Sequence, residues 1–169
     1  MISIISPIYN EADNLMELYR RVVVALESIQ EEFEFILVEN GSSDRSLEII
    51  KKLREKDPRI KYVSLSRNFG HQGGIMAGLA NVSGNAVISL DGDLQHPPEL
   101  IPNLVELWKK GYDVVYTTKK VNKHIGSWHV FPARFFYKLI SYTFPNTSRC
   151  SCNNYIRILK IYFHFLIFS

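Results

Sequence analysis

Two carboxylates separated by one glycine are the part of this sequence best suited to chemistry. Asp91-Gly92-Asp93 directly follows the apolar run 87–90 and precedes Pro97 and Pro98. The run predicts a buried strand, and prolines are tolerated where a helix begins. Carboxylates this close repel each other unless they point apart or share a cation. One interpretation is a hard divalent ion held between them and a phosphate, with Gly92 letting a ligand approach the backbone. The other is a solvated acidic turn before a helix.

Three more polar segments follow predicted strands: Tyr9-Asn10-Glu11, Glu39 to Asp44, and Arg67 to Gln72. The carboxyl ends of parallel strands meet at one edge of a sheet, so we expect all four segments to converge there. Convergence favours a nucleotide or sugar-phosphate site over four independent turns. The patterns G-x-x-x-x-G-K-[ST] and G-x-G-x-x-G are absent, which disfavours the common kinase and dinucleotide sites.

The elements that would position these segments alternate along the chain. Strands are expected at 2–5, 33–38, 60–65, 86–90 and 112–117. Helical spacing of apolar residues predicts helices over 11–29, 47–56, 75–80 and 100–110. Asn10 is expected to cap the first helix, and Gly111 to end the last. This alternation predicts an α/β fold with a doubly wound, mostly parallel sheet flanked by helices.

Charge is distributed unevenly along the 169 residues, which suffice for one well-cored domain. Residues 1–113 carry 12 Lys/Arg and 17 Asp/Glu, whereas residues 114–169 carry 8 Lys/Arg and no acid. The last third also holds 13 of the 21 aromatic residues, a composition that suits contact with phosphates at a membrane surface or in nucleic acid. The two cysteines, Cys150 and Cys152, support neither a disulfide framework nor a zinc site. No secretory signal is visible, and the apolar end is too short to span a bilayer.

An amphipathic helix or pair of turns is expected over residues 127–144, with Arg134 and Lys138 on one face. It is either a membrane-surface element or an ordinary core-facing helix. Nucleic-acid binding is not expected, because the aromatic residues lie in apolar clusters and not in a stacking platform.

The four segments, read as Ser6-Pro7-Ile8-Tyr9-Asn10-Glu11, 39–44, 66–72 and 91–99, resemble glycosyltransferase family 2. Within it they are most similar to polyprenyl-phosphate hexosyltransferases, the relatives of dolichol-phosphate mannose synthase and bactoprenol glucosyltransferase. The resemblance covers residues 2 to about 145. It implies the GT-A fold, with 1–145 as the nucleotide-sugar-binding domain and 146–169 as an incomplete or atypical C-terminal tail.

The resemblance also implies roles for single residues. Asp91 and Asp93 would be the catalytic D-x-D carboxylates that hold Mg²⁺ or Mn²⁺ on the diphosphate of a UDP- or GDP-hexose. The donor-binding residues would be Pro7, Tyr9, Glu11, Glu39, Asn40, Asp91, Gly92, Gln95 and Lys119. The basic residues that would hold a polyprenyl-phosphate acceptor are Lys120, Lys123, Arg134 and Lys138. His71 and His96 are expected to be structural or to lie beside the nucleotide, and not to act as acid or base.

Two features depart from the family pattern. The family usually has two aspartates where this chain has Glu39-Asn40, which bears on nucleotide affinity or base choice. An acidic acceptor-side motif is also missing after residue 150, where Asn153 to Leu159 resembles it weakly, so we expect a truncated acceptor half.

The absence of any acid after Asp113 favours a phosphate acceptor over a hydroxyl, since a phosphate is already ionised, with a second pKa near ~6, and needs no base. Truncation would produce the same absence.

The expected function is therefore an inverting, metal-dependent transfer of a hexose to a polyprenyl phosphate at the cytoplasmic face of a membrane. The alternative is a catalytically impaired nucleotide-binding module without its acceptor half. The resemblance leaves a homo-oligomer open.

Overall fold

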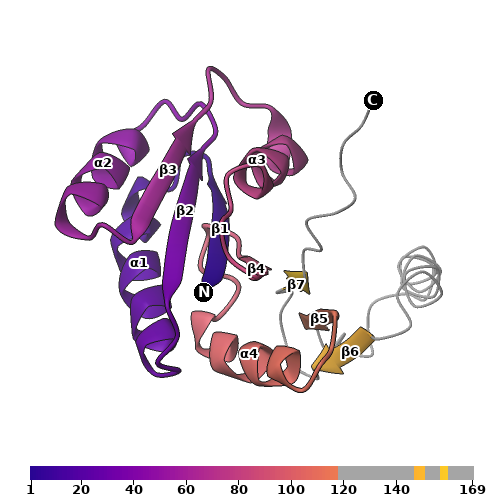
Figure 1. Ribbon diagram of the computed structural model, residues 1–169. Helices are drawn as coiled ribbons and strands as arrows, with labels where there is room; N and C mark the ends of the chain where they lie inside the picture. Colours follow the sequence, from indigo (N-terminus) through magenta and orange to yellow (C-terminus); the bar gives the residue numbers. More distant parts are fainter. Residues whose placement is uncertain (118–146, 151–156, 160–169) are drawn as a thin grey trace, which may run out of the picture.

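The computed structural model describes residues 1–117, 147–150 and 157–159 and contains one seven-stranded sheet. The strand order is β3-β2-β1-β4-β7-β5-β6 (Figure 1). The first four strands in the chain are β1 (Ile2–Ile8), β2 (Phe33–Glu39), β3 (Ile60–Ser64) and β4 (Ala86–Ser89). The last three are β5 (Val114–Thr117), β6 (Thr147–Cys150) and β7 (Arg157–Leu159).

The centre of the sheet is parallel. β1 pairs with β2 along its whole length, from Ile2 opposite Phe33 to Ile8 opposite Glu39, and also pairs with β4. At one side of the sheet β3 pairs in parallel with β2, and at the other side β6 pairs in parallel with β5. Strand β7 lies between β4 and β5 and runs antiparallel to both. The predicted α/β fold with a mostly parallel sheet is confirmed. Two of its strands lie beyond residue 145, so the sheet crosses the predicted domain boundary, and that boundary stays a prediction.

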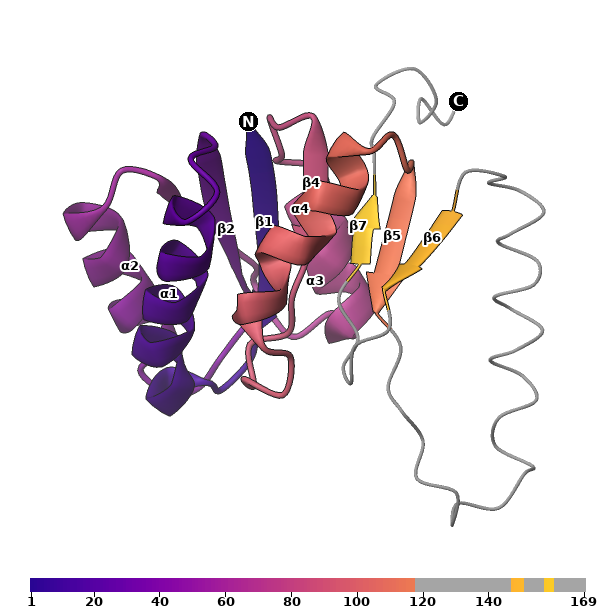
Figure 2. The same ribbon diagram turned by 90° about the horizontal axis from the view of Figure 1, so that it is seen from below.

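Helices cover both faces of the sheet (Figure 2). They are α1 (Ala12–Glu27), α2 (Ser46–Lys56), α3 (Gly70–Leu79) and α4 (Ile101–Lys109), the last preceded by a 3₁₀ turn, η1 (Pro98–Leu100). α1, α2 and α4 pack on one face and α3 on the other. Side chains alternate along a strand, so the neighbouring residues Ile4 and Ile5 enter opposite cores. The sheet is therefore covered on both faces, as a parallel sheet requires.

Helix α3 begins five residues earlier than its apolar pattern predicts, at Gly70 instead of Ile75. Glycine disfavours helix, but tertiary contact prevails here. A Cβ on Gly74 would lie 3.0 Å from Pro7 Cβ, and one on Gly78 would lie 3.2 Å from Ile5 Cβ. The missing side chains let α3 pack closely on β1, at the end of the strand where the polar segments begin.

Helix α4 begins after the two prolines and ends before Gly111, as the sequence predicts. Pro98 opens η1, where its missing N–H is harmless, and Gly111 follows the helix with a φ of +96°. Within the described part of the chain, no helix combines the length and apolarity needed to cross a membrane.

Candidate functional site

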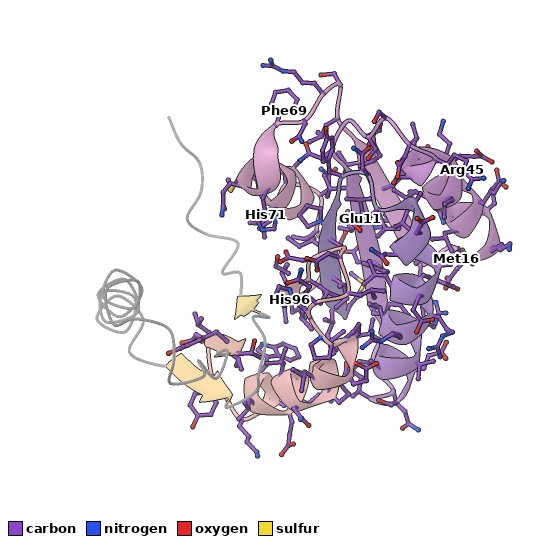
Figure 3. All side chains as sticks on the ribbon, turned by 180° about the vertical axis from the view of Figure 1, so that it is seen from behind. Glu11, Met16, Arg45, Phe69, His71 and His96 are labelled. Atoms are coloured by element: carbon purple, nitrogen blue, oxygen red, sulfur yellow. The ribbon has the colours of Figure 1, made fainter. Side chains whose placement is uncertain are left out.

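The polar segments that follow β1, β2, β3 and β4 meet at the carboxyl edge of the sheet, as predicted. Hydrogen bonds and close contacts join each to a neighbouring segment. Figure 3 shows His71, His96 and Glu11, which come from three of these regions, around this end of the molecule. Side chains far apart in the sequence are thereby brought into one site.

Reciprocal bonds join the segments that follow β1 and β2. Asn10 N–H donates to Ser42 Oγ over 3.1 Å, and Ser43 N–H donates to Asn10 Oδ1 over 2.8 Å. Asn10 therefore does not cap α1, and that prediction is wrong. The residue has a φ of +55°, and its side chain binds the neighbouring loop.

Asp44 supplies the missing cap from across the site. Its Oδ2 accepts from the N–H of Ala12, 3.0 Å away, and its Oδ1 accepts from Ser46 N–H. Burial opposes the charged form of Asp44, but hydrogen bonds from Ser46 and Ala12 outweigh it and lower the pKa. The negative charge also suits the positive end of the α1 dipole. A residue 32 positions away thus fixes the start of α1.

Glu39 and Asn40 are buried, each only 3% exposed, and their polar atoms bind the protein itself. Glu39 accepts from Ser42 N–H and from Ser64 Oγ, which links the ends of β2 and β3. Asn40 Oδ1 accepts from Phe69 N–H over 3.0 Å, and its Nδ2 donates to Gly70 O over 3.0 Å. Both side chains therefore position the loops, and any contact with a nucleotide base remains a prediction.

The loops that follow β2 and β3 lie close together at Gly41. It has a φ of +72°, and a Cβ there would lie 2.4 Å from the backbone carbon of Arg67. Only glycine fits both this conformation and this contact. The two loops are therefore in direct contact at this glycine.

The acidic pair sits directly beyond β4. The Asp91 side chain is one third exposed, and Asp93 is half-buried, with its Oδ1 accepting from Gln95 N–H over 3.0 Å. Gly92 is buried, and a Cβ on it would lie 2.7 Å from Ile8 Cδ1 and 3.2 Å from Pro7 O. Protein atoms fill the space that a Cβ on Gly92 would occupy, so the glycine allows the loop to pack against the segment after β1, and its predicted contact with a ligand stays a prediction.

Two histidines flank Asp91. His71 Nε2 lies 3.6 Å from Asp91 Oδ1, and His96 Nδ1 lies 3.2 Å from Asp91 Oδ2. His71 is half exposed at the start of α3, whereas the His96 side chain is only 15% exposed. Both histidines lie beside Asp91, and their predicted roles, structural or beside the nucleotide, stay predictions.

The other expected donor-binding residues surround this centre. Tyr9 is 46% exposed, Pro7 lies half-buried beneath α3, and Gln95 is exposed. Glu11 is half-buried, and its Oε2 accepts from Asn14 Nδ2 over 2.6 Å. Tyr9 and Gln95 thus keep surface available for a ligand.

The remaining predicted site residues lie outside the described residues. They are Lys119, Lys120, Lys123, Arg134 and Lys138, and the amphipathic segment 127–144 also falls there.

The donor set fits a divalent cation shared with a substrate. Within residues 1–117, no three His, Cys, Asp or Glu side chains form a group that could hold a metal ion by themselves. Asp91 and Asp93 nevertheless offer partly exposed carboxylate oxygens, the ligands that Mg²⁺ prefers. Mg²⁺ is commonly bound by one or two carboxylates plus substrate phosphates. The pair is suited to such a shared ion.

Sequence reasoning missed the contacts that hold the site together: the Asp44 cap, the Asn40 bridge and the link between Arg21 and Glu99. Arg21 Nε and Nη2 donate to the two Glu99 oxygens, each over 2.7 Å, which ties α1 to η1 just after the acidic pair. In the sequence, Asp44 is an acid at the end of a loop and Glu99 is an acid beside a proline turn, which are weak signals for a role in holding the site. Neither signal indicates which residue would be the hydrogen-bond partner.

Comparisons with known proteins agree with this architecture. The sequence model of glycosyl transferase family 2 matches residues 3–163. The chain is 42% identical over 139 residues to an uncharacterized glycosyltransferase, YkcC, of Bacillus subtilis, covering 82% of this chain and 43% of that protein. It is 40% identical over 162 residues to an undecaprenyl-phosphate 4-deoxy-4-formamido-L-arabinose transferase of Edwardsiella ictaluri, covering 95% of this chain and 48% of the relative. The chain thus spans less than half the length of these relatives.

Solved structures share the fold. The mannosyltransferase PcManGT from Pyrobaculum calidifontis, in complex with GDP-Man and Mn²⁺, superposes with a TM-score of 0.64 at 18% identity, covering 94% of this chain and 44% of that one. S. aureus TarS 1-349, in complex with UDP-GlcNAc, superposes with a TM-score of 0.57 at 24% identity, covering 74% of this chain and 36% of the other. The predicted GT-A fold is confirmed. With the acidic pair at the edge of a parallel sheet and the family match over 3–163, the chain belongs to glycosyl transferase family 2.

Proposed function

We propose that this chain is the donor-binding part of an inverting, metal-dependent glycosyltransferase. It would transfer a hexose from a UDP- or GDP-sugar to a polyprenyl phosphate at the cytoplasmic face of a membrane. The observation that carries the proposal is that four interlinked loops meet at the carboxyl edge of the sheet, where His71 and His96 lie beside Asp91 and the segment after β1 packs against Gly92. The names of relatives that act on undecaprenyl phosphate support the acceptor class.

The loops would contact different parts of the donor. Pro7, Tyr9 and Glu11 would hold the base and ribose, and Gln95 and Lys119 would contact the donor nearer its phosphates. Glu39 and Asn40 would keep these loops in register through their bonds to the segments after β2 and β3. Because the described loops are already bonded to each other, donor binding would require little ordering, which favours affinity.

Asp91 and Asp93 would hold a Mg²⁺ or Mn²⁺ ion, which neutralises the charge that develops on a departing diphosphate. An ionised phosphate oxygen of the acceptor would attack the anomeric carbon on the side opposite the leaving group, which inverts the configuration. The acceptor needs no general base, so positioning and electrostatics would supply the rate. Lys120, Lys123, Arg134 and Lys138 would hold its phosphate.

The test measures binding and turnover separately. UDP and GDP binding is measured by calorimetry, and release of nucleotide from UDP- and GDP-hexoses is measured with Mn²⁺ or with EDTA, each with and without polyprenyl phosphate. We expect turnover that requires Mn²⁺ and falls by about a hundredfold or more in Asp93→Ala. Asn103→Ala, at an exposed position of α4, is the matched control and should resemble the wild type.

Two results would contradict the proposal in different ways. Nucleotide binding without turnover under any of these conditions would identify a nucleotide-binding module in place of an enzyme. No binding of either nucleotide would refute the donor site itself.

A further inference from the structure

Leu94, directly after the acidic pair, has a backbone conformation that leucine rarely adopts. Its φ is +60°, in the left-handed region. The other non-glycine residues of the described part with a positive φ are Asn10, a residue type that often adopts it, and Gln30, in the turn that follows α1. A bulky apolar residue is strained in this region and stays there only when the surrounding structure holds it.

The side chain of Leu94 shows what holds it. Leu94 is half-buried and packs against the core cluster that lies between the sheet and α1, α2 and α4. A glycine would adopt the same φ without strain but could not make this contact. The packing therefore offsets the backbone strain and keeps the turn in one conformation.

The left-handed turn sets the orientation of Asp93. Because the chain reverses at Leu94, the N–H of Gln95 faces back, and Asp93 Oδ1 accepts from it over 3.0 Å. Asp93 Oδ2 makes no hydrogen bond or ion pair with the described residues. A carboxylate held at one oxygen cannot rotate freely, so Asp93 keeps Oδ2 in one direction and available to a ligand.

The segment that carries the turn is fixed on either side of it. Before the turn, Gly92 is buried against the segment after β1. After the turn, Arg21 of α1 donates two bonds to Glu99, each over 2.7 Å. The flanking chain therefore cannot shift to absorb a different backbone conformation at Leu94, and such a change would move the Asp93 carboxylate.

We propose that Leu94 is a positioning residue, whose left-handed backbone orients the Asp93 carboxylate for a divalent cation shared with a nucleoside diphosphate. The proposal rests on the metal site of the proposed function. Leu94 touches neither the cation nor the nucleotide; it acts through the Gln95 N–H that holds Asp93 Oδ1. Groups that hold a ligand carboxylate in this way typically contribute about 10- to 100-fold to metal affinity.

Three substitutions separate the backbone conformation of Leu94 from its packing. Leu94→Ile keeps the apolar volume, but its branched Cβ opposes a positive φ. Leu94→Met keeps a similar volume without that branch. Leu94→Asn accepts a positive φ but gives up the apolar packing.

The measurement is the affinity of the full chain for UDP and for GDP by calorimetry, each with saturating Mn²⁺ and with EDTA. The ratio of the two dissociation constants gives the Mn²⁺-dependent gain in affinity. A general loss of structure weakens binding under both conditions, so the ratio isolates the metal contact. Asp93→Ala marks the loss of this gain, and thermal unfolding with circular dichroism reports the stability of each variant.

We expect Leu94→Ile to lose about tenfold or more of the Mn²⁺-dependent gain while its affinity in EDTA is kept. Leu94→Met and Leu94→Asn should keep the gain within about threefold of the wild type. Leu94→Asn should nevertheless unfold at a lower temperature, because it places an amide against the core. A merely structural role predicts the opposite order, in which the gain falls with stability.

A wild-type gain in Leu94→Ile, or a loss in Leu94→Asn of about tenfold, would overturn the positioning role alone. Leu94→Asn therefore decides the question even if Leu94→Ile does not fold. Nucleotide binding with no Mn²⁺-dependent gain in the wild type, or with the same gain in Asp93→Ala, would overturn the metal site and the positioning role with it. No binding of either nucleotide would refute the donor site on which both depend.

Discussion

At Asn40 the chain carries an amide at a position where the resemblance to the family led us to expect an acid. The amide donates as well as accepts: Nδ2 reaches Gly70 O and Asn68 Oδ1, while Oδ1 receives the N–H of Phe69. A carboxylate could replace the acceptor but not the donor. The residue type is therefore set by the loop that follows β3, and the departure from the family pattern has a structural reason.

Asn40→Asp tests this reason. The introduced carboxylate would face two acceptor oxygens in a buried position, so we expect a loss of about 1–3 kcal/mol in the free energy of unfolding at pH 7. The loss should shrink in acid, where a protonated carboxyl can donate. Urea unfolding at pH 7 and pH 4 gives the measurement. Asn103→Asp, the same change at an exposed site on α4, serves as the control. Similar stability of both variants would exclude the donor role.

At the scale of elements, the sheet is held at its other end by a buried carboxylate. Glu34, near the start of β2, accepts from Ser3 Oγ, Ser83 N–H and Lys61 Nζ. These bonds join β1, β2, β3 and the turn before β4, which are the strands that carry the site loops. Burial opposes the charged form of Glu34, but the bonds from Lys61, Ser3 and Ser83 outweigh it, so its pKa lies below the usual 4.5. The alignment of the strands that carry the site loops thus depends on the Glu34 contacts, which lie at the opposite end of these strands.

Glu34→Gln should lower the free energy of unfolding at pH 7 by about 1–3 kcal/mol. Because the folded-state pKa is lowered, the stabilisation is present above pH 4.5 and is lost as the pH falls through the folded-state value. The wild type should therefore lose stability in acid more steeply than the variant. Denaturant unfolding between pH 7 and pH 3 measures both slopes. Glu106→Gln removes an exposed pair with Lys110 on α4 and should change nothing measurable. Parallel pH profiles for wild type and Glu34→Gln would contradict the assignment.

At the scale of the whole molecule, acid and base are separated along the chain. The acidic residues lie within 1–113, together with Asp91 and Asp93, and the excess of lysine and arginine lies beyond. A membrane with anionic lipids attracts clustered lysines by about 1 kcal/mol each. The proposed polyprenyl-phosphate acceptor would be presented at such a surface, so the charge separation supports the proposed location at a membrane.

Sedimentation with vesicles tests the surface role. We expect the chain to bind vesicles that contain phosphatidylglycerol, and the triple change of Lys119, Lys120 and Lys123 to Ala to weaken binding about a hundredfold. Binding should also fall in 0.5 M salt through screening. The triple change of Lys51, Lys52 and Lys56, three exposed lysines of α2, removes the same charge and is the control. Equal loss in the two triple variants would show that net charge alone is responsible.

The order of strands and helices as far as β5, and the place of Asp91-Gly92-Asp93 at a strand end, follow from the sequence alone. Local periodicity marks each element, and parallel topology brings the carboxyl ends together, so the convergence of the four loops was predictable. Strands β6 and β7 were not predicted, because four and three residues are too few for a periodic signal.

Only the tertiary structure decided which side chains hold the site. The first residue of α1 is held by Asp44 and not by its neighbour Asn10, and Asp91 meets His71 from 20 residues earlier. Such contacts depend on how closely α3 and the loops pack on β1, and that packing is set by Gly74, Gly78 and Gly92, where no side chain intervenes. The spacing of apolar residues in the sequence determines whether each segment forms a strand or a helix. The distances between segments, and hence which side chains surround the carboxylates, arise when the layers pack.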